Sequence, residues 1–126
     1  MIDVQIWDGT ILEKKLEEIL DEIYFSIKRM HPKSKVILFG SYARGDYHKG
    51  SDIDICVIVP EYTDKIIEMK LDIYENLNRY DIDIQLFLFD NKDFYDEVIH
   101  KRTLSWYINR DGKELNGNFK GDETVA

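Results

Sequence analysis

The sequence is poor in cysteine and lacks long hydrophobic runs, and each scarcity excludes a class of protein. Its 126 residues contain a single cysteine, Cys56, which cannot form an internal disulfide or a cysteine-based zinc site. No run approaches the roughly 18 apolar residues that a transmembrane helix needs. The first residues carry Asp3 and Asp8 and have no apolar stretch of the kind found in signal peptides. These features predict a cytoplasmic protein with no membrane association.

Positive charge is also scarce. Lys and Arg total 17 against 25 Asp and Glu, which gives a formal net charge of −8. This balance argues against direct binding to nucleic acid, which needs clustered positive charge. An apolar fraction of 44% predicts a folded globule. We expect one domain over residues 1–126, with residues 116–126 as a flexible tail because they are rich in glycine and charge.

The spacing of apolar residues predicts three helices and three strands. The expected helices are one over 11–30, one capped by Thr63 with an apolar stripe from Ile66 to Leu77, and one that starts near Asn91 and continues past Trp106. The expected strands are 36–39, 52–59 and 82–89. This order indicates an α/β or α+β domain with a small mixed sheet. Because each helix has a single apolar stripe, the helices should cover one face and leave the other free for polar groups.

Two aspartates at the start of the second strand are candidate metal ligands. Asp52 and Asp54 are two residues apart, so strand alternation places both carboxylates on one face. Two like charges this close are costly unless a cation lies between them. Mg²⁺ commonly uses one or two carboxylates together with phosphate oxygens. An isolated Asp-x-Asp is more often a solvated strand face, so the surrounding residues decide between the two interpretations.

A candidate phosphate-binding turn follows the first predicted strand. Gly40 lets a phosphate approach the backbone amides, Ser41 adds a hydroxyl donor, and Arg44 could reach phosphate oxygens. Taken alone, Gly40 and Ser41 would more commonly form an ordinary turn. Their position immediately after a buried strand and shortly before the aspartate pair favours nucleotide binding.

A third carboxylate is available from the third predicted strand. Asp83 lies between two isoleucines and should project away from the helix-covered face. Since adjacent strands are about 4.8 Å apart, Asp83 could complete an acidic triad with Asp52 and Asp54, as a ligand of a second metal ion or as a general base. Asp81 shares its face and competes for this role.

The segment from Gly40 to Asp54 resembles a known signature. Gly40-Ser41, ten residues and then Asp52-Ile53-Asp54 are similar to the GSx10DxD motif of the nucleotidyltransferase superfamily with the DNA polymerase β fold, and in particular to its minimal nucleotidyltransferases. The resemblance extends over about 36–115. It implies that Asp52, Asp54 and Asp83 bind one or two Mg²⁺ ions, and that Gly40 and Ser41 bind the triphosphate of ATP.

The same resemblance implies a function. Many minimal nucleotidyltransferases are antitoxins that transfer AMP from ATP to a tyrosine of a HEPN-domain RNase toxin. Arg44 and His48 are too close together for the HEPN Arg-x4-6-His motif, so we expect this chain to be the transferase. Three alternatives stay open: an antitoxin that acts by contact alone, a transferase for a small molecule such as an antibiotic, and a structural domain. An oligomer is compatible with all of them.

Overall fold

The computed structural model describes residues 10–62, 64–77 and 82–117. The elements are α1 (Thr10–Met30), β1 (Lys35–Phe39), α2 (Ser41–Arg44), β2 (Ile53–Val59), α3 (Lys65–Leu77), β3 (Ile84–Asp90), α4 (Asn91–Glu97), α5 (Leu104–Asp111) and β4 (Lys113–Glu114). The predicted α+β class is confirmed. The predicted cap Thr63, the competing carboxylate Asp81 and most of the predicted tail lie outside the described residues.

The strands form a mixed four-stranded sheet in the order β3-β2-β1-β4. Strand β1 runs antiparallel to both β2 and β4, whereas β2 and β3 are parallel. The register pairs Asp54 with Phe39 on one side and with Gln85 on the other. The end of β1 and the starts of β2 and β3 therefore meet at one end of the sheet.

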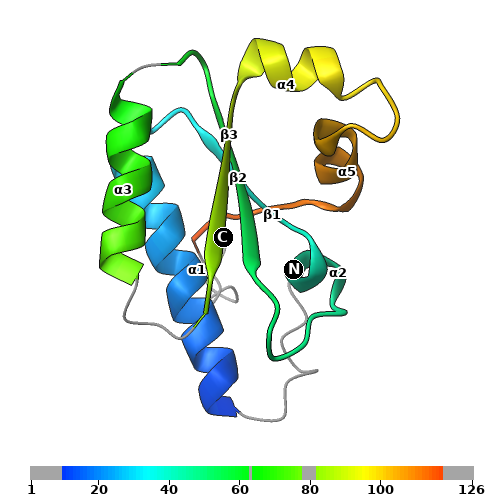
Figure 1. Ribbon diagram of the computed structural model, residues 1–126. Coiled ribbons are helices and arrows are strands. Elements are labelled where there is room, and N and C mark those ends of the chain that lie inside the picture. Colours follow the sequence, from blue (N-terminus) through cyan, green and yellow to red (C-terminus); the bar gives the residue numbers. More distant parts are fainter. Residues whose placement is uncertain (1–9, 63, 78–81, 118–126) are drawn as a thin grey trace.

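The main core lies between one sheet face and the helices α1 and α3, which run side by side (Figure 1). Ile19 and Ile23 of α1 and Ile55 of β2 are fully buried there. Their spacing is the helical and strand periodicity visible in the sequence. Within the described ranges, no helix is both long enough and apolar enough to cross a membrane.

The opposite sheet face carries a second, smaller core. Phe94 of α4 and Ile108 of α5 pack there with Cys56 and Ile58 of β2. The finer expectation that all helices cover one face thus holds for α1 and α3, while α4 and α5 lie on the other side (Figure 1). The physical reason is that β2 is apolar at successive positions from Ile55 onward, so both of its faces need cover.

The single helix expected beyond Asn91 is wrong, because α4 ends at Glu97 and α5 begins at Leu104. Arg102 has a φ of 75°, which interrupts helical geometry. The hydroxyl oxygen of Thr103 then accepts a hydrogen bond from the amide of Trp106 at 3.1 Å and caps α5. The break lets α5 turn back and pack beside α4 over the second core.

Two tyrosine hydroxyls bond to the backbone of the edge strand β3. The amide of Leu86 donates to the hydroxyl of Tyr74 at 3.1 Å, and the hydroxyl of Tyr62 donates to the carbonyl of Leu88 at 2.9 Å. Strand β3 is the last in the sheet order, so its outer side has no neighbouring strand within the described ranges. These side chains satisfy backbone groups that strand pairing leaves open.

Candidate active site

Polar residues gather where β1 ends and β2 and β3 begin. Gly40 follows directly after Phe39, which pairs with Asp54. The amide of Ile53 donates to the carbonyl of Asp83 at 2.8 Å, which ties the segment before β3 to the start of β2. Farther along the same sheet face, the second core is covered by α4 and α5. The uncovered end of this face is therefore the polar one.

Asp52 and Asp54 come together as the sequence predicted, on one face and both half-buried. Burial raises the pKa of the Asp54 carboxyl, the negative charge of Asp52 raises it further, and the positive charge of Arg44 opposes both. The pair is thus electrostatically strained when both groups are ionised. Two carboxylates with hard oxygen atoms in this state could hold a divalent cation such as Mg²⁺.

Gly40 lies against this carboxylate pair. Its φ is 76°, and a side-chain Cβ at this position would overlap Oδ2 of Asp54. Its carbonyl accepts hydrogen bonds from the amides of Ala43 and Arg44 at 3.1 and 3.0 Å, which closes the short helix α2 that begins at Ser41. The sequence predicted a non-helical turn here, and the short helix α2 is a correction. A phosphate at this point would meet the first amides of α2 and the backbone of Gly40.

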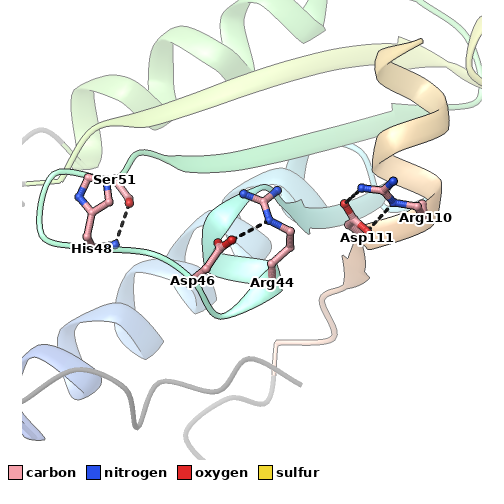
Figure 2. A network of polar contacts seen from close by, with 6 residues as sticks. All are labelled: Arg44, Asp46, His48, Ser51, Arg110 and Asp111. Atoms are coloured by element: carbon pink, nitrogen blue, oxygen red, sulfur yellow. Dashed lines mark hydrogen bonds and ion pairs between the residues drawn. The ribbon is translucent and has the colours of Figure 1, made fainter. Parts of the chain in front are cut away.

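Arg44 ends α2 and is half-exposed. Its Nε donates to Oδ2 of Asp46 at 3.2 Å (Figure 2). Nearby, Arg110 makes two 2.8 Å hydrogen bonds to Asp111 at the end of α5. The pKa of the Asp111 carboxyl is lowered, first by the hydrogen bond from Arg110 and also by the charge of Arg44. The charge of Arg44 therefore acts on both Asp54 and Asp111, and sequence analysis had missed Asp111.

The loop from α2 to β2 is closed by its own hydrogen bonds. The amide of His48 donates to Oγ of Ser51 at 2.9 Å (Figure 2). The amide of Gly50 donates to Nδ1 of His48 at 3.1 Å. The amide of Ser51 also donates to the carbonyl of His48 at 2.9 Å. This short closed turn fixes the chain immediately before Asp52.

Two stacked tyrosines connect the candidate site to the main core. The rings of Tyr42 and Tyr47 are 4.3 Å apart between centroids and nearly parallel. Both are buried, and burial together with the charge of Asp52 raises the pKa of the Tyr42 phenol. Tyr42 therefore anchors α2, and with it the turn at Gly40, to the main core.

Asp83 is exposed, and the register of β2 and β3, continued by one residue from the pair Ile53 and Ile84, places it beside Asp52. No group of three or more His, Cys, Asp or Glu side chains among the described residues is arranged to hold a metal ion. The structure thus brings Asp52 and Asp54 together as a pair, and the acidic triad stays a prediction.

Gln85 is a site residue that sequence analysis missed. It pairs with Asp54 in the register, and its Nε2 donates to Oδ2 of Asp52 at 3.1 Å. Gln85 lies two residues beyond Asp83, so strand alternation places both side chains on the same face, and this spacing could have indicated its place in the site. Gln85 carries an amide and not a carboxylate, so the pattern of acidic residues does not indicate it.

Comparison with known proteins identifies the family of this chain. Residues 14–110 match the family described as nucleotidyltransferase domain. The protein adenylyltransferase MntA of Shewanella oneidensis is 32% identical over 96 residues, which cover 75% of this chain and 63% of that protein. A Methanocaldococcus jannaschii protein provisionally named as a protein adenylyltransferase is 34% identical over 70 residues, which cover 56% of this chain and 62% of that protein. The matches thus span less than two thirds of either relative.

Solved structures show the same fold. A toxin–antitoxin structure with AMP-PNP superimposes with a TM-score of 0.50 at 25% identity, over 85% of this chain and 77% of that chain. A mutant MntA–HpeT toxin–antitoxin structure gives a TM-score of 0.51 at 25% identity, over 82% of this chain and 77% of that chain. The family match over residues 14–110 covers more than half of the chain, and the fold agrees with it, so the chain belongs to the nucleotidyltransferase domain family.

Proposed function

We propose that this protein transfers AMP from ATP to a hydroxyl group, in a Mg²⁺-dependent reaction, and that the acceptor is a tyrosine of a HEPN-domain toxin. The protein would then act as the antitoxin of the pair. The names of its relatives support the activity, since the Shewanella oneidensis relative is a protein adenylyltransferase. The similar structures support the partner, since both are toxin–antitoxin structures.

The observation that carries the proposal is the contact between Gly40 and Asp54. The absence of a side chain at residue 40 brings backbone against a half-buried carboxylate. A group that binds both must offer oxygen atoms to the amides and a positive charge to the carboxylate. A metal-bound triphosphate has both properties.

The roles of the chain's residues follow from their positions. Asp52 and Asp54 would hold Mg²⁺, which neutralises the triphosphate and stabilises the charge that develops during transfer. Ser41, the first amides of α2 and Arg44 would hold phosphate oxygens. The acceptor oxygen forms a bond to the α-phosphorus while the bond from that phosphorus to the bridging oxygen breaks, and pyrophosphate leaves. Asp83 would accept the proton of the acceptor hydroxyl.

The overall charge favours a basic protein partner. The formal net charge of −8 repels nucleic acid and attracts a positively charged surface. An RNase surface that binds RNA has this character. The charge therefore supports an RNase toxin more than a nucleic-acid acceptor.

The test is label transfer from ATP to a candidate HEPN-domain partner. With Mg²⁺ present, label from the α-phosphate should appear on the partner and label from the γ-phosphate should not. Chelation with EDTA should abolish the transfer. The double variant Asp52→Asn with Asp54→Asn should transfer at least about 100-fold less, since it removes the charges that hold the metal.

A matched double variant serves as the control. Asp72→Asn with Glu75→Gln removes two exposed carboxylates of α3, on the other side of the sheet, and should retain full activity. Transfer that persists in the Asp52 and Asp54 variant would overturn the mechanism. A tight complex without label would instead show an antitoxin that acts by contact alone, and label on a small hydroxylated antibiotic would replace the protein acceptor.

A further inference from the structure

A neutral side chain of the candidate site touches a candidate metal ligand. Nε2 of Gln85 lies 3.1 Å from Oδ2 of Asp52. The side chains come from parallel strands in which Gln85 pairs with Asp54, so Gln85 and Asp52 meet diagonally across the strand pair. Gln85 is exposed, so tight packing does not force this contact.

The direction of this hydrogen bond is fixed by chemistry. An ionised carboxylate only accepts hydrogen bonds, so the amide nitrogen of Gln85 and not its oxygen must face Asp52. A bond to an ionised acceptor is stronger than a bond between neutral groups. The amide therefore occupies one oxygen of Asp52 and restricts rotation of the carboxylate.

The neutrality of Gln85 also matters. Lysine or arginine at this position would bond to Asp52 but would compete with a cation for its charge. Glutamate would place a further negative charge opposite Asp54. An amide orients the carboxylate and leaves its charge available.

We propose that Gln85 is the positioning residue of Asp52, and that it sets the affinity of the site for a divalent cation by fixing which carboxylate oxygen is presented. This inference rests on the proposed function, because it takes Asp52 as a metal ligand. It predicts that loss of the amide weakens cation binding and leaves the fold and the chemical step largely intact.

The experiment is a titration with Mn²⁺ followed by electron paramagnetic resonance, with and without AMP-PNP. Gln85→Leu keeps the bulk and removes the donor, and Gln85→Thr keeps polarity and strand preference but is too short to reach Asp52. Both should bind Mn²⁺ about 10-fold more weakly, the low end of the range for loss of a ligand-orienting partner, because the bond is solvent-exposed. In label transfer, the Mg²⁺ concentration for half-maximal rate should rise, while the rate at saturating Mg²⁺ stays near wild type.

Asn76→Leu is the matched control, since it makes the same amide-to-apolar change on an exposed position of α3. It should leave Mn²⁺ binding unchanged. Wild-type affinity in both Gln85 variants, or a loss only in the bulky leucine variant, would overturn the role of Gln85. Failure of the wild-type protein to bind Mn²⁺ at all would instead overturn the proposed function on which this role depends.

Discussion

At the scale of single residues, the two glycines that flank α2 should respond differently to the same substitution. Gly45 is left-handed, with φ 87° and ψ 6°, so alanine there should cost roughly 1 kcal/mol of unfolding free energy. Gly40 has φ 76° and ψ −157°, a region found essentially only for glycine, so alanine there should cost more. A Cβ at Gly40 overlaps the Asp54 carboxylate, whereas a Cβ at Gly45 meets nothing within 4 Å. Gly40→Ala should therefore also abolish Mn²⁺ binding and label transfer.

Urea unfolding and Mn²⁺ titration separate the two effects. Gly45→Ala is the control, because it also places alanine at a positive φ beside α2 but creates no overlap. Equal Mn²⁺ binding in the two variants would show that the close approach of Gly40 to Asp54 has no part in the site.

Cys56 predicts a specific pH dependence of stability. Burial raises the pKa of its thiol from 9.0 to about 12. The folded state keeps the thiol neutral, so its stabilising effect is complete below pH 9 and is lost as the pH rises from 9 towards 12. Between pH 8 and pH 10 the thiol should account for a loss of about 1.4 kcal/mol of unfolding free energy.

The comparison is with Cys56→Ala, which has no thiol to ionise. Urea unfolding at each pH gives the difference in stability between the two proteins, and that difference should shrink by the stated amount. A constant difference across this range would contradict the prediction. Titration of tyrosines and lysines is common to both proteins and cancels.

The candidate site was predictable at this scale only for residues whose chemistry is visible in isolation. Strand alternation was enough to place Asp52 and Asp54 on one face, and the glycine before Ser41 indicated a close approach. Gln85 was not found because its role depends on the register of β2 against β3. Asp111 was missed because it lies far along the chain from Arg44, whose charge acts on it.

At the scale of elements, the cap of α5 is a point of local stability. Oγ1 of Thr103 accepts from the amide of Trp106 at 3.1 Å and lies within hydrogen-bonding distance of the carbonyls of Glu97 and His100, at 3.0 and 2.9 Å. Thr103→Ala should cost about 1 kcal/mol of unfolding free energy through loss of the N-cap. Thr103→Ser keeps the hydroxyl and should lose much less in urea unfolding. Equal losses would assign the effect to the methyl group.

The limits of element prediction have physical causes. The break between α4 and α5 was not foreseen because the chain has neither glycine nor proline from Val98 to Thr103, and Arg102 adopts the positive φ. Helix α2 is only four residues long, which is too short to show periodicity. Strand β4 has only two residues, too few for an alternating pattern, and it is a strand because it pairs with β1.

At the scale of the whole molecule, the two cores share one sheet and should differ in local stability. Phe94 is 2% exposed in the smaller core beside Cys56, and Ile23 is fully buried in the larger one. Alanine should cost about 3–5 kcal/mol at Phe94 and about 2–5 kcal/mol at Ile23. Phe94→Ala should also speed labelling of the Cys56 thiol beyond what the loss of global stability explains, because the cover over that thiol opens locally.

Ile23→Ala is the control for that measurement. Its labelling rate should rise only in proportion to the unfolded population measured in urea. If both variants label in proportion to global stability, the two cores unfold as one unit.

The arrangement of the whole sheet was only partly predictable. Three of the four strands were evident locally from their apolar residues, and the mixed sheet was expected. The parallel pairing of β2 with β3 joins segments about 30 residues apart, and no local pattern specifies it. The second core could have been expected from the consecutive apolar residues Cys56 to Val59, since a strand with one solvated face alternates.

The tyrosines along β3 restrict how other proteins can recognise this one. An exposed strand edge is a template for β-augmentation, in which a foreign peptide adds a strand, and for aggregation between copies. Tyr74 and Tyr62 already occupy the amide of Leu86 and the carbonyl of Leu88. A peptide would have to displace both hydroxyls before it could continue the ladder. Along β3, recognition by a partner therefore depends on surface side chains and not on the backbone of the strand.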